Sequence, residues 1–342
     1  MKRFHCHCGN EVFFENTHCT ACGSQLGFDP SKGELLTLMA SSEASKKVID
    51  TVGNHYLVCE HRQHALLCNW LLPPDSENGQ CISCRLTRVI PMQSYPQNVK
   101  RWSVLESAKR RMVYGLLQLN LRLRYFRSVE GQERSMVFDF LEDKRSNPDV
   151  DQELVYSGHV NGVITINVAE ADSSYREATR EAMNEPYRTL LGHFRHETGH
   201  YYWDQLIVGS EYSEGFKSLF GDHTLPYRET MNNYYANGPA SDWQTDYISA
   251  YASAHPLEDW AETWAHYLLM HETLETAVGY GLVKQLTDQR LFDAWMGEWM
   301  QLVVVLNALN RSIGNVDAYP FVISERVHKK LRFVHEVILQ AN

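Results

Sequence analysis

Apolar positions along the chain follow helical spacing far more often than strand spacing. Between residues 102 and 126 they recur every three or four positions with basic residues between them, which predicts an amphipathic helix. Two short runs, 136–141 and 162–168, are rich in the residues that strands prefer. From about residue 172 onward the pattern is mostly helical. The sequence therefore predicts the α+β class, with a mainly helical body and a small sheet.

The distribution of cysteine predicts a domain boundary. All 8 cysteines lie before residue 85, and none follows. A stretch with proline and glutamine, residues 91–96, comes after them and is typical of a linker. We therefore expect two domains: residues 1–95, which carry the cysteines, and residues 96–342, which open with the amphipathic helix.

The cysteines form two groups of four. The first has two close pairs ten residues apart with a glycine after each pair, and the second has one close pair and looser spacing. Four thiolates complete a tetrahedral zinc site, and close pairs in a reducing compartment bind metal more often than they form disulfides. The alternative, thiols without a special role, fits the close pairs poorly. We expect one structural zinc ion in each group: Cys6, Cys8, Cys19 and Cys22 in the first cysteine group, and Cys59, Cys68, Cys81 and Cys84 in the second cysteine group.

Charge and hydropathy limit the classes of partner and the cellular location that we expect. The net charge is -10, and residues 97–342 carry 33 acidic against 24 basic side chains. An acidic surface repels phosphate backbones, so we expect no broad binding to nucleic acid. No apolar run reaches the roughly 18 residues of a membrane helix, and residues 1–6 are not followed by the apolar core of a signal peptide. These patterns predict a cytoplasmic protein with no membrane partner.

The strongest chemical signal is the pentapeptide His196-Glu-Thr-Gly-His200. We expect it to lie in one helix, with Pro186 in the first turn and Gly209 at the end. Two imidazoles four positions apart share one helix face and can bind one ion, while Glu197 can accept a proton from a water at that ion. The alternative is three polar residues on a solvated helix face. Apolar and aromatic flanks argue against that alternative.

A catalytic zinc ion needs a third protein ligand and an open position. The short-spaced position for that ligand holds Leu206, so the ligand must come from elsewhere. Downstream, Pro256 begins a predicted helix on which Glu258 and Glu262 lie one turn apart. This spacing suits a division of labour in which Glu258 binds the metal and Glu262 accepts a hydrogen bond from a ligand histidine.

Other assignments stay open on the sequence alone. Acidic residues in a first turn stabilise a helix N-terminus without any metal. His193, His255 and His266 are also candidates for the third ligand, although interior histidines are more often hydrogen-bonded. The two tryptophans on either side of Glu262 favour the metal site.

With these two motifs the chain resembles the gluzincins, a class of zinc peptidases. Over nearly its full length it is similar to a bacterial family of zinc-binding metallopeptidases with an N-terminal zinc ribbon. The segments that carry the similarity are 6–22, 68–70, 162–172 and 242–267. The resemblance implies a zincin-like domain after the ribbon, with one catalytic and two structural zinc ions. It places the catalytic zinc ligands at His196, His200 and Glu258, the general base at Glu197, and the hydrogen-bonding carboxylate at Glu262.

The resemblance also implies how substrate is handled. Tyr251 stands seven residues before Glu258, where a gluzincin with a similar Glu-x-x-Ala-Glu helix has a tyrosine near its zinc. We expect Tyr251, with Tyr247 as second choice, to stabilise the oxyanion. The strand at 162–168 is the candidate edge strand for pairing with an extended substrate. The implied substrate is a protein or peptide, with the ribbon as a candidate recruiting element.

A second interpretation is a non-catalytic, zinc-dependent protein-interaction module whose third zinc ion is structural. Glu197 distinguishes the two interpretations, because a structural site has no use for a carboxylate beside its ligands. Its presence favours the peptidase.

Overall fold

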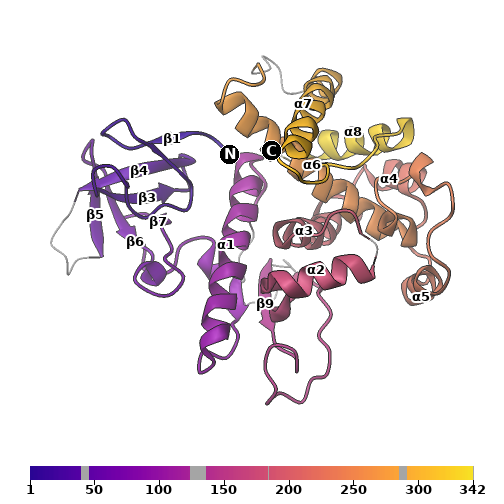
Figure 1. The fold of residues 1–342 in the computed structure, drawn as a ribbon, viewed down its shortest axis with the longest axis horizontal. Coiled ribbons are helices and arrows are strands. Elements are labelled where there is room, and N and C mark those ends of the chain that lie inside the picture. Colours follow the sequence, from indigo (N-terminus) through magenta and orange to yellow (C-terminus); the bar gives the residue numbers. More distant parts are fainter. Residues whose placement is uncertain (40–45, 124–135, 184, 285–290, 342) are drawn as a thin grey trace. The chain divides into compact units, whose positions relative to one another are not determined.

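The computed structural model describes residues 1–39, 46–123, 136–183, 185–284 and 291–341. The chain divides into two compact units, Met1–Glu177 and Ala178–Asn342 (Figure 1). Every described strand belongs to the first unit, and the helix α2 (Ser173–Ala182) spans the point of division. The predicted α+β class is confirmed: a cysteine-rich segment comes first, and the chain is mostly helical later.

Two small sheets organise the cysteine-rich segment. The strands β1 (Phe4–His5) and β2 (Glu11–Val12) form an antiparallel pair. Five further strands follow one another in an antiparallel meander that is buried on both faces: Leu26 and Phe28 lie on one face, and Leu38 lies on the other with Val48, Tyr56 and Leu71. These strands are β3 (Gln25–Asp29), β4 (Glu34–Met39), β5 (Lys47–Asp50), β6 (His55–Val58) and β7 (Leu71–Leu72). The cysteine spacing alone does not predict this meander.

The first long helix, α1 (Pro96–Gln118), is displaced from its predicted range of 102–126. It begins earlier because Pro96, assigned to the linker, occupies the first helical turn, where a missing N–H group costs nothing. It ends earlier because Asn120 adopts a left-handed backbone, φ 52°. Residues 124–126 of the predicted helix lie outside the described residues.

Helix α1 packs on the cysteine-rich segment. Tyr114 is fully buried, and its ring centroid lies 5.2 Å from that of Phe14 and 5.8 Å from that of Phe28. Trp102, in the second turn of the same helix, packs edge-on against His61 and His64. The predicted boundary at residues 95 and 96 thus separates a helix from the strands on which it packs.

A mixed four-stranded sheet completes the first unit. Its order is β10 (Gly158–Val160), β11 (Val163–Asn167), β9 (Val137–Leu141), β8 (Thr87–Val89). The two predicted strands are confirmed as β9 and β11. The prediction that 162–168 is an edge strand is wrong, because β11 is paired with β9 on one side and with β10 on the other.

The second unit is built around one long helix, α6 (Pro256–Gly279). It contacts α3 (Leu190–Leu206), α4 (Ser213–Phe220), α7 (Phe292–Ser312) and α8 (Glu325–Gln340). The core between these helices is aromatic. Trp260 and Trp264 are fully buried, and Tyr202 stacks on Trp264 with the ring centroids 4.9 Å apart. The helix α5 (Tyr227–Asn237) buries only Met231. Among the described residues no helix is both long enough and apolar enough to cross a membrane.

In the described part of the chain, five short 3-10 helices connect these elements. They are η1 (Glu60–Arg62), η2 (Cys84–Leu86), η3 (Val168–Ala171), η4 (Trp243–Thr245) and η5 (Tyr251–Ala254).

Candidate metal centres

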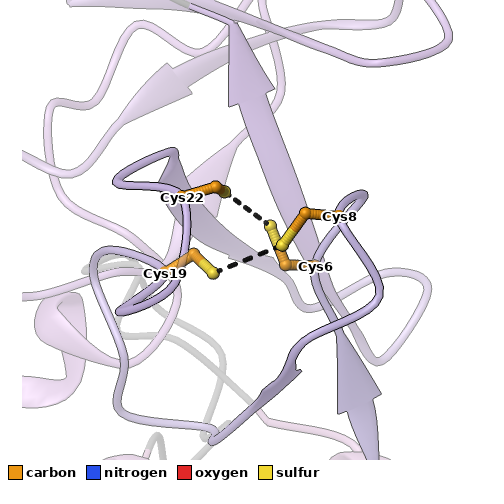
Figure 2. A group of neighbouring side chains, drawn as sticks. All are labelled: Cys6, Cys8, Cys19 and Cys22. Atoms are coloured by element: carbon orange, nitrogen blue, oxygen red, sulfur yellow. Dashed lines mark hydrogen bonds between the residues drawn. The ribbon is translucent and has the colours of Figure 1, made fainter.

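The first cysteine group gathers around two tight turns (Figure 2). Gly9 and Gly23 have left-handed backbone angles, φ 86° and 75°, and their N–H groups donate to the carbonyls of Cys6 and Cys19. The two sulfur pairs joined in Figure 2 are 3.6 and 3.8 Å apart. Zinc–sulfur bonds of about 2.3 Å in a tetrahedron put the sulfurs about 3.8 Å apart. The four thiols therefore fit a zinc ion.

The second cysteine group has the same dimensions but a different exposure. Cys68 Sγ lies 3.7 Å from the Sγ atoms of both Cys81 and Cys84. All four side chains of this group are buried, whereas the first group exposes Cys8 and Cys22. None of the eight cysteines forms a disulfide. Two closed four-sulfur sites, one buried and one half-exposed, follow from this geometry.

A buried cation accompanies the second cysteine group. Arg110 of α1 is buried, which lowers the pKa of its guanidinium, but the negative charge of Cys68 and Glu106 outweighs burial and raises that pKa. A guanidinium in this place offsets the charge of the thiolates. The second group is thus tied electrostatically to α1.

The third centre lies where α3 meets α6. Thr189 starts α3 by accepting a hydrogen bond from the Gly192 N–H group at 3.0 Å, so the helix begins at Leu190 and not near Pro186 as predicted. It ends at Leu206, shortly before Gly209. Pro256 begins α6 as predicted.

Gly199 allows these two helices to meet closely. A Cβ atom at Gly199 would lie 2.9 Å from the Ala261 Cα atom, and the Trp260 indole donates to the Gly199 carbonyl at 2.9 Å. Glycine within the pentapeptide therefore sets the approach of the two helices. This approach brings Glu258 to the two histidines.

The ligand atoms of His196, His200 and Glu258 lie within 4.8 Å of one another. His196 Nε2 lies 3.0 Å from Glu258 Oε2 and 3.2 Å from His200 Nε2, which is 3.4 Å from Glu258 Oε1. A tetrahedral zinc ion with bonds of about 2.0–2.1 Å puts its ligand atoms about 3.3 Å apart. The separations therefore fit one zinc ion.

The hydrogen bond at Nδ1 of His196 leaves Nε2 directed at the other ligand atoms, as a metal ligand requires. This Nδ1 lies 2.7 Å from Glu262 Oε1, and because the carboxylate can only accept, Nδ1–H donates. In the neutral ring Nε2 is then an acceptor that faces another acceptor, Glu258 Oε2. A cation between them removes this conflict. Glu262 is held in turn by Ser249, whose hydroxyl donates to Glu262 Oε2 at 2.6 Å.

The pKa values at this centre show how tightly its charges are coupled. Burial lowers the pKa of His196, but hydrogen bonds to Glu258 and Glu262 outweigh burial and raise that pKa well above its usual value. Burial raises the pKa of Glu262, yet His196 outweighs it and brings the pKa down to about 2. The pKa of Glu258 is likewise lowered despite burial, chiefly by the two histidines. Positive charge is therefore favoured between the two carboxylates, and a zinc ion would supply it in place of a proton on His196.

Glu197 is buried beside the ligands, and among the described residues its Oε2 has no hydrogen-bond partner. A buried carboxylate oxygen without a donor costs free energy, about 1–3 kcal/mol or more. This oxygen is available to a water or a substrate group. Three side chains that could bind a metal ion thus converge beside a buried carboxylate that has one unsatisfied oxygen.

The structure places the alternative ligands elsewhere. His255 caps α6, because its Nδ1 accepts from the Leu257 N–H group while its Nε2 lies 3.2 Å from the Leu225 carbonyl. His266 Nδ1 lies 2.8 Å from the Tyr319 hydroxyl. Among the described residues, His193 is not one of the side chains whose ligand atoms converge at this centre.

The two tyrosines proposed for the oxyanion differ in position. Tyr251 begins η5, and its ring centroid lies 5.9 Å from that of His196. Burial and the charge of Glu258 raise the pKa of Tyr251 well above its usual value, so its hydroxyl stays a donor. Tyr247 instead packs against Lys330, whose ammonium lies 4.5 Å from the Tyr247 ring centroid.

Two residues at this centre have no signal in the sequence. Tyr227, the first residue of α5, donates from its hydroxyl to Glu258 Oε1 at 2.7 Å. Ser249 holds Glu262, as described above. Both contacts depend on loops that return to α6, and no spacing rule connects either residue with its partner.

Comparison with known proteins places the chain in a family. A family model described as "Putative zinc-binding metallo-peptidase" matches residues 98–337. The chain belongs to this family. A zinc-ribbon domain model matches residues 3–95 of this family member. Both matches support zinc as the metal.

The relatives found do not add a named activity. Proteins called "Uncharacterized protein" from Mycobacterium tuberculosis and Mycobacterium bovis are 38% identical to the metallopeptidase-family chain over 347 residues. The match covers 99% of this chain and 95% of each relative. No solved structure matches.

Proposed function

We propose that this chain is a zinc peptidase of the gluzincin type that hydrolyses a peptide bond in a protein or peptide substrate. The observation that carries the proposal is the convergence of His196, His200 and Glu258 beside the buried, unpartnered oxygen of Glu197. Membership of the metallopeptidase family supports it. The two cysteine groups would each hold one structural zinc ion.

The roles of the residues follow from their contacts. A bound zinc ion would supply a Lewis acid for the peptide carbonyl and for water. Glu197 accepts a proton from water at its unpartnered oxygen and passes the proton to the leaving nitrogen. Glu262 keeps the proton of His196 on Nδ1, which leaves Nε2 for the metal. Tyr251 donates a hydrogen bond to the developing oxyanion.

The setting of the activity is also part of the proposal. Eight thiols without a disulfide are suited to a reducing compartment, which supports a cytoplasmic location. The ribbon recruits the protein or peptide substrate. The acidic balance of the chain supports a protein partner over nucleic acid.

The test is cleavage of a mixed peptide library by the full, zinc-loaded chain, with products identified by mass spectrometry. Glu197→Gln keeps shape and metal but removes the base, so we expect turnover to fall about 10²–10⁴-fold. Glu214→Gln, at an exposed position on α4, is the matched control and should cleave like the unaltered chain. Equal cleavage by Glu197→Gln would contradict the role of Glu197. If the third centre proved to have a fourth protein ligand, the non-catalytic interaction module would replace the peptidase.

A further inference from the structure

Tyr227 reaches the third metal centre from a helix that carries none of the ligands. It follows Pro226 at the start of α5, and its hydroxyl lies 2.7 Å from Glu258 Oε1. The carboxylate can only accept, so Tyr227 is the donor. Glu258 itself is almost completely buried, 1% exposed.

The two oxygens of Glu258 therefore have different surroundings. Oε2 faces His196 Nε2 at 3.0 Å, while Oε1 accepts from Tyr227 and lies farther, 3.4 Å, from His200 Nε2. A carboxylate with one oxygen engaged by a phenol cannot rotate without losing that hydrogen bond. The contact thus distinguishes Oε2 from Oε1.

His255 holds the segment that presents Tyr227. Its Nδ1 accepts from the Leu257 N–H group at the start of α6, and its Nε2 lies 3.2 Å from the Leu225 carbonyl, to which Nε2–H donates in that tautomer. The Tyr227 ring packs edge-on against the His255 ring at 5.1 Å. One histidine thus links the N-terminus of the helix that carries Glu258 to the chain just before α5.

We propose that Tyr227 is a positioning residue for the third centre: its hydroxyl fixes the Glu258 carboxylate so that one defined oxygen faces the zinc ion. This inference rests on the proposed function, because it takes Glu258 as a zinc ligand. Hydrogen bonds to metal ligands typically contribute 10–100-fold in metal affinity. The zinc affinity of the third centre is therefore the quantity that Tyr227 controls.

The packing of Tyr227 does not depend on its hydroxyl group. The side chain is 46% exposed, and α5 contributes little to the core of the unit. A phenylalanine in its place keeps the ring against His255 and removes only the hydrogen bond to Glu258. A structural role of the ring survives this change, whereas a positioning role does not.

The experiment measures zinc at the third centre of the full chain by competition with a chelator of known affinity. The variants are Tyr227→Phe, Tyr227→Leu and a matched control, Tyr280→Phe, whose side chain is 45% exposed at the far end of α6. We expect Tyr227→Phe and Tyr227→Leu to bind the third zinc ion about 10–100-fold more weakly and Tyr280→Phe to match the unaltered chain.

Each other result overturns the inference in a distinguishable way. If Tyr227→Phe binds the third zinc ion as tightly as the unaltered chain, the hydroxyl has no positioning role, and the proposed function still stands. A lower zinc affinity in Tyr227→Leu alone would then assign the role to the ring. A loss of the two cysteine-bound zinc ions together with the third would show general unfolding, and would contradict a positioning role. If the unaltered chain binds no third zinc ion, the proposed function fails, and the role of Tyr227 fails with it.

Discussion

Gly199 lies against the backbone of Ala261, and this close approach sets the distance between the two helices of the third metal centre. An added Cβ atom would stand 2.9 Å from Ala261 Cα and 3.2 Å from a ring carbon of Trp264. Backbone cannot move aside as a flexible side chain can, so α3 and α6 would have to separate. Glu258 would then move away from His196 and His200.

Gly199→Ala should therefore reduce both stability and zinc binding. Overpacking of this kind costs about 1–3 kcal/mol in the free energy of unfolding. Gly297→Ala in α7 is the control, because an added Cβ there meets nothing within 4 Å, and it should be neutral or stabilising by up to about 1 kcal/mol. Thermal unfolding and zinc titration measure both effects. Equal stability of the two variants would show that Gly199 does not set the helix distance.

Replacement of Glu258 should empty one zinc site and leave the two cysteine sites occupied. Glu258→Gln keeps the shape of the side chain but replaces a charged ligand by a weak one, so we expect the zinc content to fall from about three ions per chain to about two. Glu336→Gln, at an exposed position on α8, should retain three. Elemental analysis of freshly purified protein gives the count. Three ions in Glu258→Gln would mean that another residue is the third ligand.

The two cysteine groups should release zinc at different rates. Cys8 and Cys22 are exposed in the first group, whereas every cysteine of the second group is buried. A chelator reaches an exposed thiolate directly, but it reaches a buried site only after local unfolding. We expect the first group to release its zinc ion first in a time course with a coloured chelator. The early phase should disappear in Cys8→Ser and persist in Cys81→Ser, and the reverse pattern would contradict the assignment.

The division at residue 95 can be tested with the fragment 96–342. Tyr114 would lose Phe14 and Phe28 in this fragment, and Trp102 would lose His61 and His64. We expect the helical unit to stay folded and α1 to become sensitive to protease, because its buried face would be exposed to water. Mass spectrometry of limited digests locates the cuts. Full protection of α1 in the fragment would support two domains that fold independently at this boundary.

Local patterns predicted much of the third centre. Side chains four positions apart share a helix face, so the pentapeptide and the pair Glu258 and Glu262 could be identified by spacing alone. The predicted contact between Glu262 and a ligand histidine is present, and the histidine is His196. Zinc occupancy and catalysis at these residues stay predictions.

Contacts between distant segments were not predictable in the same way. Tyr227 and Glu258 are brought together by the return of the chain from α5 to α6, and no local period records that return. The start of α3 was missed because the Thr189 hydroxyl caps the helix three residues after Pro186. Cysteine spacing does not predict the five-stranded meander, because strand pairing depends on the packing of side chains from separate segments.

Anomalous diffraction at the zinc absorption edge, from crystals of the full chain, can locate every zinc ion and its ligands. We predict three zinc peaks, one of them bounded by His196 Nε2, His200 Nε2 and the Glu258 carboxylate. At that peak one coordination position should be open to solvent, with Glu197 within about 2.6–3.2 Å of a water in that position. No peak between these three side chains, or a fourth protein side chain in the open position with Glu197 turned away, would contradict the peptidase.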